Sequence, residues 1–159
     1  MTSNKPELGS QAPNFKSIAV GGEYGSAGKE VNLDDFKGKT LILYFYPKDD
    51  TPGCTKQACG LRDNWKEIKS KAVIFGVSID SVAKHNKFIE KFDLPFPLLS
   101  DETKELVESF GVWVEKSMYG KKYMGTERTT FVIDEKGTIK AIFTKVKPEE
   151  HLNKLLEIL

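Results

Sequence analysis

Two stretches of the chain, 40–46 and 73–79, are apolar at almost every position. Runs of this length and composition are typical of strands that are buried on both faces of a sheet. Between them, apolar side chains recur with alternating spacings of four and three residues, which places them on one face of a helix. They are Cys54, Ala58, Leu61, Trp65, Ile68 and Ala72. A strand, a helix and a strand of these lengths predict a right-handed crossover with parallel strands.

The rest of the chain predicts further helices and strands. Helices are expected over 82–92, around 106–110 and from Pro148 onward, with a short strand near 98–99. The segments 129–133 and 138–143 flank the turn-like sequence 134–137, which indicates an antiparallel hairpin. An α/β core that closes with a hairpin and a helix has the element order of a thioredoxin-like fold, with a central mixed sheet flanked by helices. We expect one such domain over 1–159, because this length suits a single core.

Composition and charge argue against several classes of function. Lys and Arg total 24 against 23 Asp and Glu, so the net charge of +1 gives no reason to expect a nucleic acid as partner. No apolar stretch reaches the roughly 18 residues of a membrane span, and the first residues lack the apolar core of a signal peptide. We therefore expect a cytoplasmic protein with no membrane contact. In that reducing compartment, two cysteines are expected to be redox-active rather than structural.

The first of these cysteines, Cys54, lies where a helix is expected to begin. Thr51 followed by Pro52 predicts an N-cap with proline at the first helical position, so Cys54 falls in the first turn. Unpaired backbone N–H groups and the helix dipole stabilise an anion there, so the thiolate is favoured and can act as a nucleophile. The alternative is a buried structural cysteine, since a free cysteine often serves as a small hydrophobic residue.

The second cysteine, Cys59, stands five residues after the first, and the chain has no others. On an intact helix this spacing separates the two Cα atoms by roughly 8.6 Å and turns the side chains about 140° apart. A disulfide tolerates Cα separations only up to roughly 7 Å. The two sulfurs are therefore not expected to bond while the helix is formed.

The residues around Cys54 resemble those of a known family. Pro47, Thr51 and Cys54 form a Pro-x-x-x-Thr-x-x-Cys pattern similar to the peroxidatic motif of peroxiredoxins, and Cys59 resembles the second cysteine of the subgroup called bacterioferritin comigratory protein or PrxQ. The similarity also includes Gly9, Ala12, Pro13, Phe15 and the segments 60–63, 100–102, 110–113 and 127–134. The resemblance implies a thioredoxin-dependent thiol peroxidase that reduces hydrogen peroxide and organic hydroperoxides without a metal or bound cofactor.

The resemblance also implies a role for five residues. Cys54 attacks the peroxide and becomes a sulfenic acid, and Cys59 resolves it as an intrachain disulfide. Thr51 contacts the thiolate or the peroxide through its hydroxyl, and Pro47 shields the thiolate from water. Arg128 stabilises the thiolate and the charge on the peroxide oxygens through its fixed donor fork.

Each of the supporting residues has a plainer alternative. Thr51 could serve as the N-cap alone, and Pro47 could simply end the preceding strand. Arg128 could be an exposed arginine at a strand end, and Cys59 an idle surface thiol. Gln57 could help to hold the loop, but it is expected to be an ordinary polar helix position.

Other residues that often carry chemistry are interpreted as structural. Trp65 and Trp113 are expected to pack. His85 and His151 are expected to be ordinary side chains, because the histidines and cysteines lack the spacing of a zinc site. The glycine-rich segment 21–28 indicates a hairpin or loop rather than a nucleotide-binding loop.

Two other functions remain open on the residues alone. One is a dithiol–disulfide oxidoreductase that acts on proteins, which the five-residue cysteine spacing disfavours. The other is a non-enzymatic, chaperone-like binding domain on the same fold. For the peroxidase, the expected partners are a peroxide substrate and thioredoxin or a similar dithiol protein. A monomer is expected, because an intrachain cysteine pair needs no second subunit.

Overall fold

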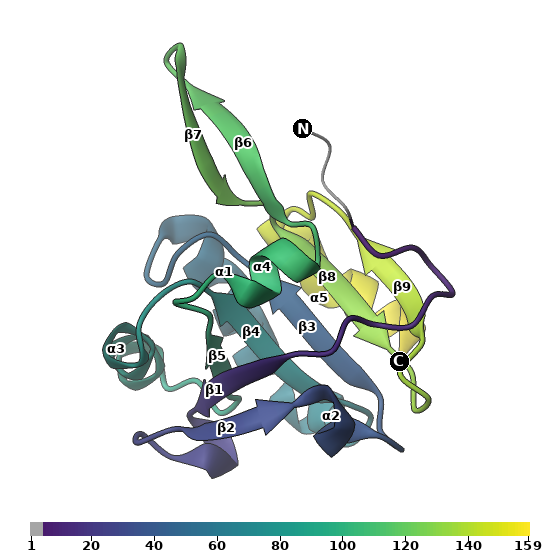
Figure 1. Ribbon diagram of the computed structural model, residues 1–159. Coiled ribbons are helices and arrows are strands. Elements are labelled where there is room, and N and C mark those ends of the chain that lie inside the picture. Colours follow the sequence, from purple (N-terminus) through teal and green to yellow (C-terminus); the bar gives the residue numbers. More distant parts are fainter. Residues whose placement is uncertain (1–4) are drawn as a thin grey trace.

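A computed structural model describes residues 5–159, which fold around a seven-stranded sheet (Figure 1). Its strand order is β2-β1-β5-β4-β3-β8-β9. The strands are β1 (Lys16–Val20), β2 (Lys29–Asn32), β3 (Leu41–Phe45), β4 (Val73–Ser78), β5 (Leu98–Ser100), β8 (Thr129–Ile133) and β9 (Ile139–Phe143). A separate two-stranded hairpin consists of β6 (Trp113–Met118) and β7 (Lys121–Thr126). The helices are α1 (Pro52–Asp63), α2 (Trp65–Lys69), α3 (Val82–Phe92), α4 (Glu105–Ser109) and α5 (Pro148–Ile158), with short 3₁₀ turns η1 (Gly22–Tyr24) and η2 (Leu33–Phe36).

The predicted crossover between the two apolar strands is confirmed. β3 and β4 are parallel neighbours, paired from Leu41 with Val73 to Phe45 with Val77. β8 lies antiparallel on the other side of β3 and pairs with β9, so the predicted hairpin is also present. β5 is parallel to β4, and β1 is antiparallel to β5. The prediction of a central mixed sheet flanked by helices is therefore correct.

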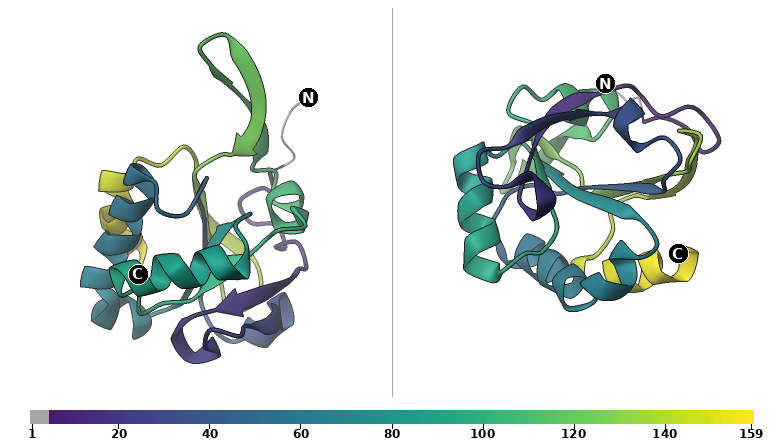
Figure 2. Two further views of the ribbon diagram at one scale, coloured as in Figure 1. Left: turned by 90° about the vertical axis from the view of Figure 1, so that its left-hand side faces the viewer. Right: turned by 90° about the horizontal axis from the view of Figure 1, so that it is seen from below.

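Strand β3 is buried on both faces. Its residues alternate between two hydrophobic clusters, with Leu41, Leu43 and Phe45 in one and Ile42 and Tyr44 in the other. Helices α1, α2, α3 and α5 contribute to the second cluster, whereas α4 and the segment before β1 contribute to the first, so helices cover both sides of the sheet (Figure 2). A strand with no solvent-facing side has no polar positions, which explains its continuously apolar sequence.

The helical region after β3 is interrupted where the sequence predicts continuity. Asn64 has φ −120° and ψ 19°, and it separates α1 from α2. Its side chain donates to the carbonyl of Gly60 at 3.0 Å, and asparagine competes in this way with the regular helix bonds. Ile68 remains fully buried, so α2 keeps the expected apolar face toward the sheet. The prediction of one helix reaching Ala72 is wrong, although its buried stripe is right.

Two parts of the fold are predicted only weakly, or not at all, by the sequence. β1 and β2 pair antiparallel on either side of the glycine-rich segment, where the sequence indicates only a hairpin or loop. The hairpin β6–β7 was not expected, because most of its side chains are half-buried or exposed and its apolar residues do not alternate with polar ones. Among the helices of residues 5–159, none is long and apolar enough to cross a membrane.

Replacement of Gly76 by alanine is expected to destabilise the fold. A Cβ atom at this position in β4 would lie 2.7 Å from atoms of Tyr44 and of Leu98. Because both neighbours are buried, the overpacking should lower the free energy of unfolding by about 1–3 kcal/mol, measured by urea denaturation. Gly60→Ala is the matched control, because nothing lies within 4 Å of its Cβ position and alanine should stabilise α1 by roughly 1 kcal/mol. Equal stability of Gly76→Ala and the parent chain would contradict the packing argument.

Candidate active site

Cys54 lies in the first turn of α1, just beyond the carboxyl end of β3. Thr51 occupies the N-cap position with an extended backbone and Pro52 is the first helical residue, as predicted. The backbone N–H groups of Gly53 and Cys54 have no intrahelical acceptor at these positions. Together with the helix dipole they create a positive environment around the sulfur. Cys54 is only 2% exposed, so this environment is shielded from water.

Arg128 adds a full positive charge beside the same sulfur. Its Nη2 atom lies 3.4 Å from Cys54 Sγ, and its Nη1 atom donates to Gln57 Oε1 at 2.7 Å. The sheet register places Arg128 there: Thr129 pairs with Phe45, so the residue before β8 lies next to the loop that follows β3. The planar guanidinium fork therefore contacts α1 at two positions one turn apart.

Glycine at position 53 permits this close approach. A Cβ atom there would lie 3.2 Å from Arg128 Nη2 and 3.3 Å from Pro148 Cγ. Both distances are shorter than an ordinary van der Waals contact between such atoms. A larger residue would therefore push either the guanidinium or the start of α5 away from the sulfur.

Gln57 is a site residue to which the sequence interpretation gave too little weight. An ordinary polar helix position is predicted, but Gln57 is only 2% exposed and holds Arg128 in place. Its Nε2 atom is buried and has no hydrogen-bond partner within residues 5–159. The available signal was its spacing, because a residue three positions after Cys54 lies on the same helix face.

Thr51 and Pro47 both belong to the loop between β3 and α1. The Thr51 hydroxyl does not cap the helix but donates to the carbonyl of Lys48 at 2.9 Å. This bond uses the hydroxyl proton and leaves the oxygen able to accept another bond. Thr51 is thus the N-cap by backbone geometry alone. Pro47 is half-buried and follows β3 by two residues.

Cys59 lies on the same helix as Cys54. It is half-buried, and both residues are free cysteines. α1 runs without a break through both positions, so the geometric separation of roughly 8.6 Å between their Cα atoms applies. A disulfide between them requires α1 to unwind.

A buried polar network fixes the loop between β3 and α1. Asp49 accepts a hydrogen bond from the Tyr46 hydroxyl and lies 2.6 Å from His85 Nδ1. The backbone N–H of Asp49 donates to Asp80 Oδ2 at 2.8 Å. The other ring nitrogen of His85 lies 2.9 Å from the carbonyl oxygen of Leu99. These bonds tie the loop to the end of β4, to α3 and to β5, so the entry into α1 is held from three directions.

The same network contains a group of potential metal ligands. In the described part of the chain, ligand atoms of Asp49, Asp80 and His85 lie within 4.8 Å of one another. These atoms already hydrogen-bond to one another and to their neighbours, including a bond of 2.6 Å from Ser78 to Asp80. The three side chains are therefore satisfied without an ion.

His151 on α5 packs behind the site. Its ring centroid lies 5.3 Å from that of Tyr44, and its Nε2 atom lies 2.8 Å from Thr130 Oγ1. Burial first, and then the charge of Arg128, lower the pKa of His151 to about 3. His151 therefore stays neutral near neutral pH, which avoids a second cation next to the guanidinium.

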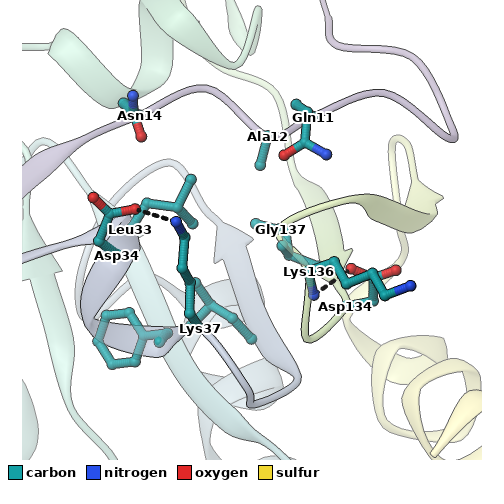
Figure 3. A pocket seen from close by; sticks show the side chains of 12 residues that line it. Gln11, Ala12, Asn14, Leu33, Asp34, Lys37, Asp134, Lys136 and Gly137 are labelled. Atoms are coloured by element: carbon teal, nitrogen blue, oxygen red, sulfur yellow. Dashed lines mark hydrogen bonds and ion pairs between the residues drawn. The ribbon is translucent and has the colours of Figure 1, made fainter.

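Two hollows lie near opposite ends of β3. One, of about 730 Å³, borders the loop before α1 and is lined by Asp49, Asp50, Phe88 and charged residues of α3. The other, of about 250 Å³, is lined by Leu41 and by a mixture of polar and apolar side chains, among them Gln11, Lys37 and Leu33 (Figure 3). The first hollow borders the loop that leads into α1, whereas Leu41 begins β3 at its other end, and neither Cys54 nor Arg128 lines either hollow.

The fold and the site together define a class of protein. A reduced, buried cysteine at a helix start, in contact with an arginine on a thioredoxin-like α/β scaffold, is suited to a thiol peroxidase. The chain belongs to the AhpC/TSA family, whose model matches residues 8–142. Within it, the chain falls in the peroxiredoxin Bcp/PrxQ group, which uses a thiol reductant to reduce peroxide.

Individual relatives align over almost their full length. The putative peroxiredoxin Bcp of Coxiella burnetii is 52% identical over 147 residues, which cover 92% of this chain and 93% of the relative. The peroxiredoxin Bcp of Bacillus subtilis is 47% identical over 154 residues, covering 96% and 94%. A structure of Xanthomonas campestris peroxiredoxin Q superposes with a TM-score of 0.81 at 37% identity, covering 91% of this chain and 88% of that one.

Acid should destabilise the protein in part through His151. Because its pKa falls from 6.5 to about 3 on folding, its contribution to stability is complete above pH 6.5 and is lost as the pH falls toward 3. Asp101 acts in the opposite sense: burial raises its pKa from 3.8 to about 6, so its contribution is complete below pH 3.8 and is lost as the pH rises through 6.

The variant His151→Gln removes only the first effect. Between pH 7 and pH 4, the parent chain should lose about 2–3 kcal/mol more unfolding free energy than this variant, measured by urea denaturation at both pH values. The contribution of Asp101 cancels in the comparison. Parallel pH profiles of the two proteins would show that His151 is hydrated rather than buried in a neutral form.

Proposed function

We propose that this chain reduces hydrogen peroxide and organic hydroperoxides at the sulfur of Cys54. The observation that carries the proposal is the 3.4 Å contact between Arg128 Nη2 and Cys54 Sγ at a buried helix start. A thiolate in this setting attacks one peroxide oxygen, and the S–O bond forms as the O–O bond breaks. The sulfur is oxidised to a sulfenic acid, and the other oxygen takes up a proton and leaves as water or an alcohol.

The neighbouring polar groups suit the charge that develops in this step. Arg128 stabilises negative charge on the peroxide oxygens, together with the free backbone N–H groups at the start of α1. The Thr51 oxygen, whose proton is used by Lys48, accepts the O–H of the peroxide. Pro47 shields the sulfur from water on the side of the loop.

Cys59 resolves the sulfenic acid in this proposal. Its sulfur attacks the Cys54 sulfur, so a disulfide forms and the sulfenic oxygen leaves as water. Because the two Cα atoms are too far apart on a formed helix, α1 unwinds before this step. Gly60 lowers the cost of unwinding by roughly 1 kcal/mol relative to alanine.

A dithiol protein of the thioredoxin type then reduces the disulfide to two thiols. The cycle is complete within one subunit, so we propose a monomeric enzyme with a single domain over 1–159. Support for organic substrates comes from the bacterioferritin comigratory protein of Xanthomonas campestris, whose alkyl peroxide reduction activity is named with its structure.

The two competing functions make a different prediction about stoichiometry. A protein disulfide oxidoreductase, or a chaperone-like domain, would consume peroxide at most once for each cysteine pair. The proposed enzyme consumes it catalytically when thioredoxin, its reductase and NADPH are present.

Replacement of Cys54 and replacement of Cys59 should impair different steps of the cycle. Cys54→Ser should lose peroxide reduction entirely, because no other thiol has a charged donor and a helix start beside it. Cys59→Ser should keep the first turnover and then stall or become overoxidised, unless a small thiol replaces the resolving cysteine. Rapid mixing with peroxide, followed by the thioredoxin-coupled assay, measures both steps. Thioredoxin-dependent turnover by Cys54→Ser would refute the assignment.

Hydrogen exchange should detect the unwinding of α1. In the reduced protein, amides of 55–62 should be protected, beginning with Thr55, whose N–H bonds to the carbonyl of Thr51, and in the disulfide form they should lose protection while β3 and β4 keep theirs. Gly60→Ala, which stabilises the helix, should slow disulfide formation more than it slows the first attack on peroxide. Equal protection of this segment in both redox states would mean that the disulfide forms without opening α1.

A further inference from the structure

The hairpin β6–β7 stands apart from the rest of the fold. Its strands pair with each other through six residue pairs, from Trp113 with Thr126 to Met118 with Lys121, and within residues 5–159 they join no other sheet. Figures 1 and 2 show the hairpin projecting from the body of the protein. Six residues of extended strand span roughly 20 Å. A projecting two-stranded ribbon adds little to core burial, so its length calls for another explanation.

Large apolar side chains are concentrated on this ribbon. Met118, Tyr119, Tyr123 and Met124 are 56%, 98%, 44% and 48% exposed. In the described part of the chain, only Leu8 is a comparably exposed large hydrophobic residue outside the hairpin. Exposed aromatic and methionine side chains gathered on one element mark a surface that binds another protein.

The turn at the tip uses a residue that is poor for folding. Tyr119 and Gly120 connect the strands, and both have positive φ, 52° and 78°. A two-residue turn of this kind favours Asn or Asp followed by Gly, because a bulky side chain at positive φ is strained. Tyrosine therefore costs local stability and, at 98% exposure, has almost no packing within the chain to offset it. Its presence is better explained by a contact outside the chain.

The base of the hairpin adjoins the active site. β7 ends at Thr126, two residues before Arg128. On β6, the side chain of Lys116 packs over Gly125, and burial followed by the charge of Arg128 lowers the pKa of Lys116. A protein that bound along the ribbon would therefore also reach the entrance to Cys54.

Charge indicates which kind of protein fits. The ribbon carries Lys116, Lys121 and Lys122 against a single acidic residue, Glu115. Two copies of the same ribbon would bring like charges together, which disfavours self-association through this surface. A partner with acidic residues around an apolar patch is complementary to it.

We propose that the hairpin β6–β7 docks the dithiol protein that reduces the enzyme, by binding an acidic and apolar surface of that partner. The inference rests on the proposed function, because it assumes a disulfide between Cys54 and Cys59. In the docked complex, a partner thiolate attacks one sulfur of this disulfide, so a mixed disulfide forms while the Cys54–Cys59 bond breaks and the other enzyme sulfur leaves as a thiolate. The partner's second thiol then displaces the enzyme thiolate, so the partner leaves oxidised and the enzyme regains two thiols after taking up two protons.

Size distinguishes a protein partner from a small thiol. The tip of the ribbon lies roughly 20 Å beyond its base. A globular domain of about 100 residues has a radius of gyration of about 13 Å, so it is large enough to contact the tip and the base at the same time. A small dithiol reaches the disulfide without touching the ribbon. The tip should therefore matter for thioredoxin and not for dithiothreitol.

Tyr119→Asn is the decisive variant, because asparagine is the better turn residue and the hairpin should fold at least as well. Its kcat/KM for thioredoxin should fall roughly five- to tenfold, as for loss of an exposed aromatic anchor. Its reduction by dithiothreitol and its single-turnover rate with peroxide should not change. Leu8→Asn, which removes an exposed apolar residue elsewhere, should leave all three rates unchanged.

A second variant tests the charge. Lys121→Glu combined with Lys122→Glu should also lower kcat/KM for thioredoxin and should weaken its dependence on ionic strength. Unchanged thioredoxin kinetics in both hairpin variants would overturn the docking proposal alone, as would an equal loss with dithiothreitol. If thioredoxin did not reduce the parent chain while dithiothreitol did, recycling by thioredoxin and docking would both be wrong, and peroxide reduction at Cys54 would stand.

Discussion

The contact between the guanidinium of Arg128 and the sulfur of Cys54 is the constraint on which the rest of the site depends. A buried thiolate is costly unless a positive donor is close, and Cys54 is almost completely buried. The donor can reach the sulfur only because β8 pairs with β3 in one register, because position 53 has no side chain, and because Gln57 holds the other nitrogen of the fork. The neutral state of His151 keeps a competing cation away from this arrangement.

Helix α1 has to satisfy two opposing requirements. In the reduced protein its residues Cys54, Ala58 and Leu61 pack into the cluster between the helices and the sheet, and this packing aligns the sulfur with its donors. In the proposed cycle the same helix must come apart so that Cys59 can reach Cys54. The loop before α1 does not face these opposing requirements, because the network around Asp49 anchors it to three other elements. The loop can therefore stay fixed while the helix opens, and the site can reassemble around it.

Much of this architecture can be predicted from the sequence, because buried positions are apolar and recur with the period of the helix or strand that contains them. The continuous apolar runs identify β3 and β4, and the stripe from Cys54 identifies the buried face of α1. What it could not predict depends on contacts between distant segments: the burial of Gln57 follows from Arg128 arriving 71 residues later in the chain. The hairpin β6–β7 was missed for a different reason. Apart from Trp113 at its base, most of its side chains are half-buried or exposed, so its strands lack the alternation of apolar and polar residues that identifies a strand packed on a core.

The break at Asn64 gives the molecule a boundary between two levels of stability. A continuous helix would transmit unwinding from its first turn to its last, because each residue fixes the geometry of the next. The interruption separates α1 from α2, whose Ile68 remains anchored in the core. Opening can then be confined to one cooperative unit while the adjoining unit keeps the global fold intact. Selection can consequently adjust α1 for the rate of a chemical cycle and α2 for the lifetime of the protein, with little interference between the two.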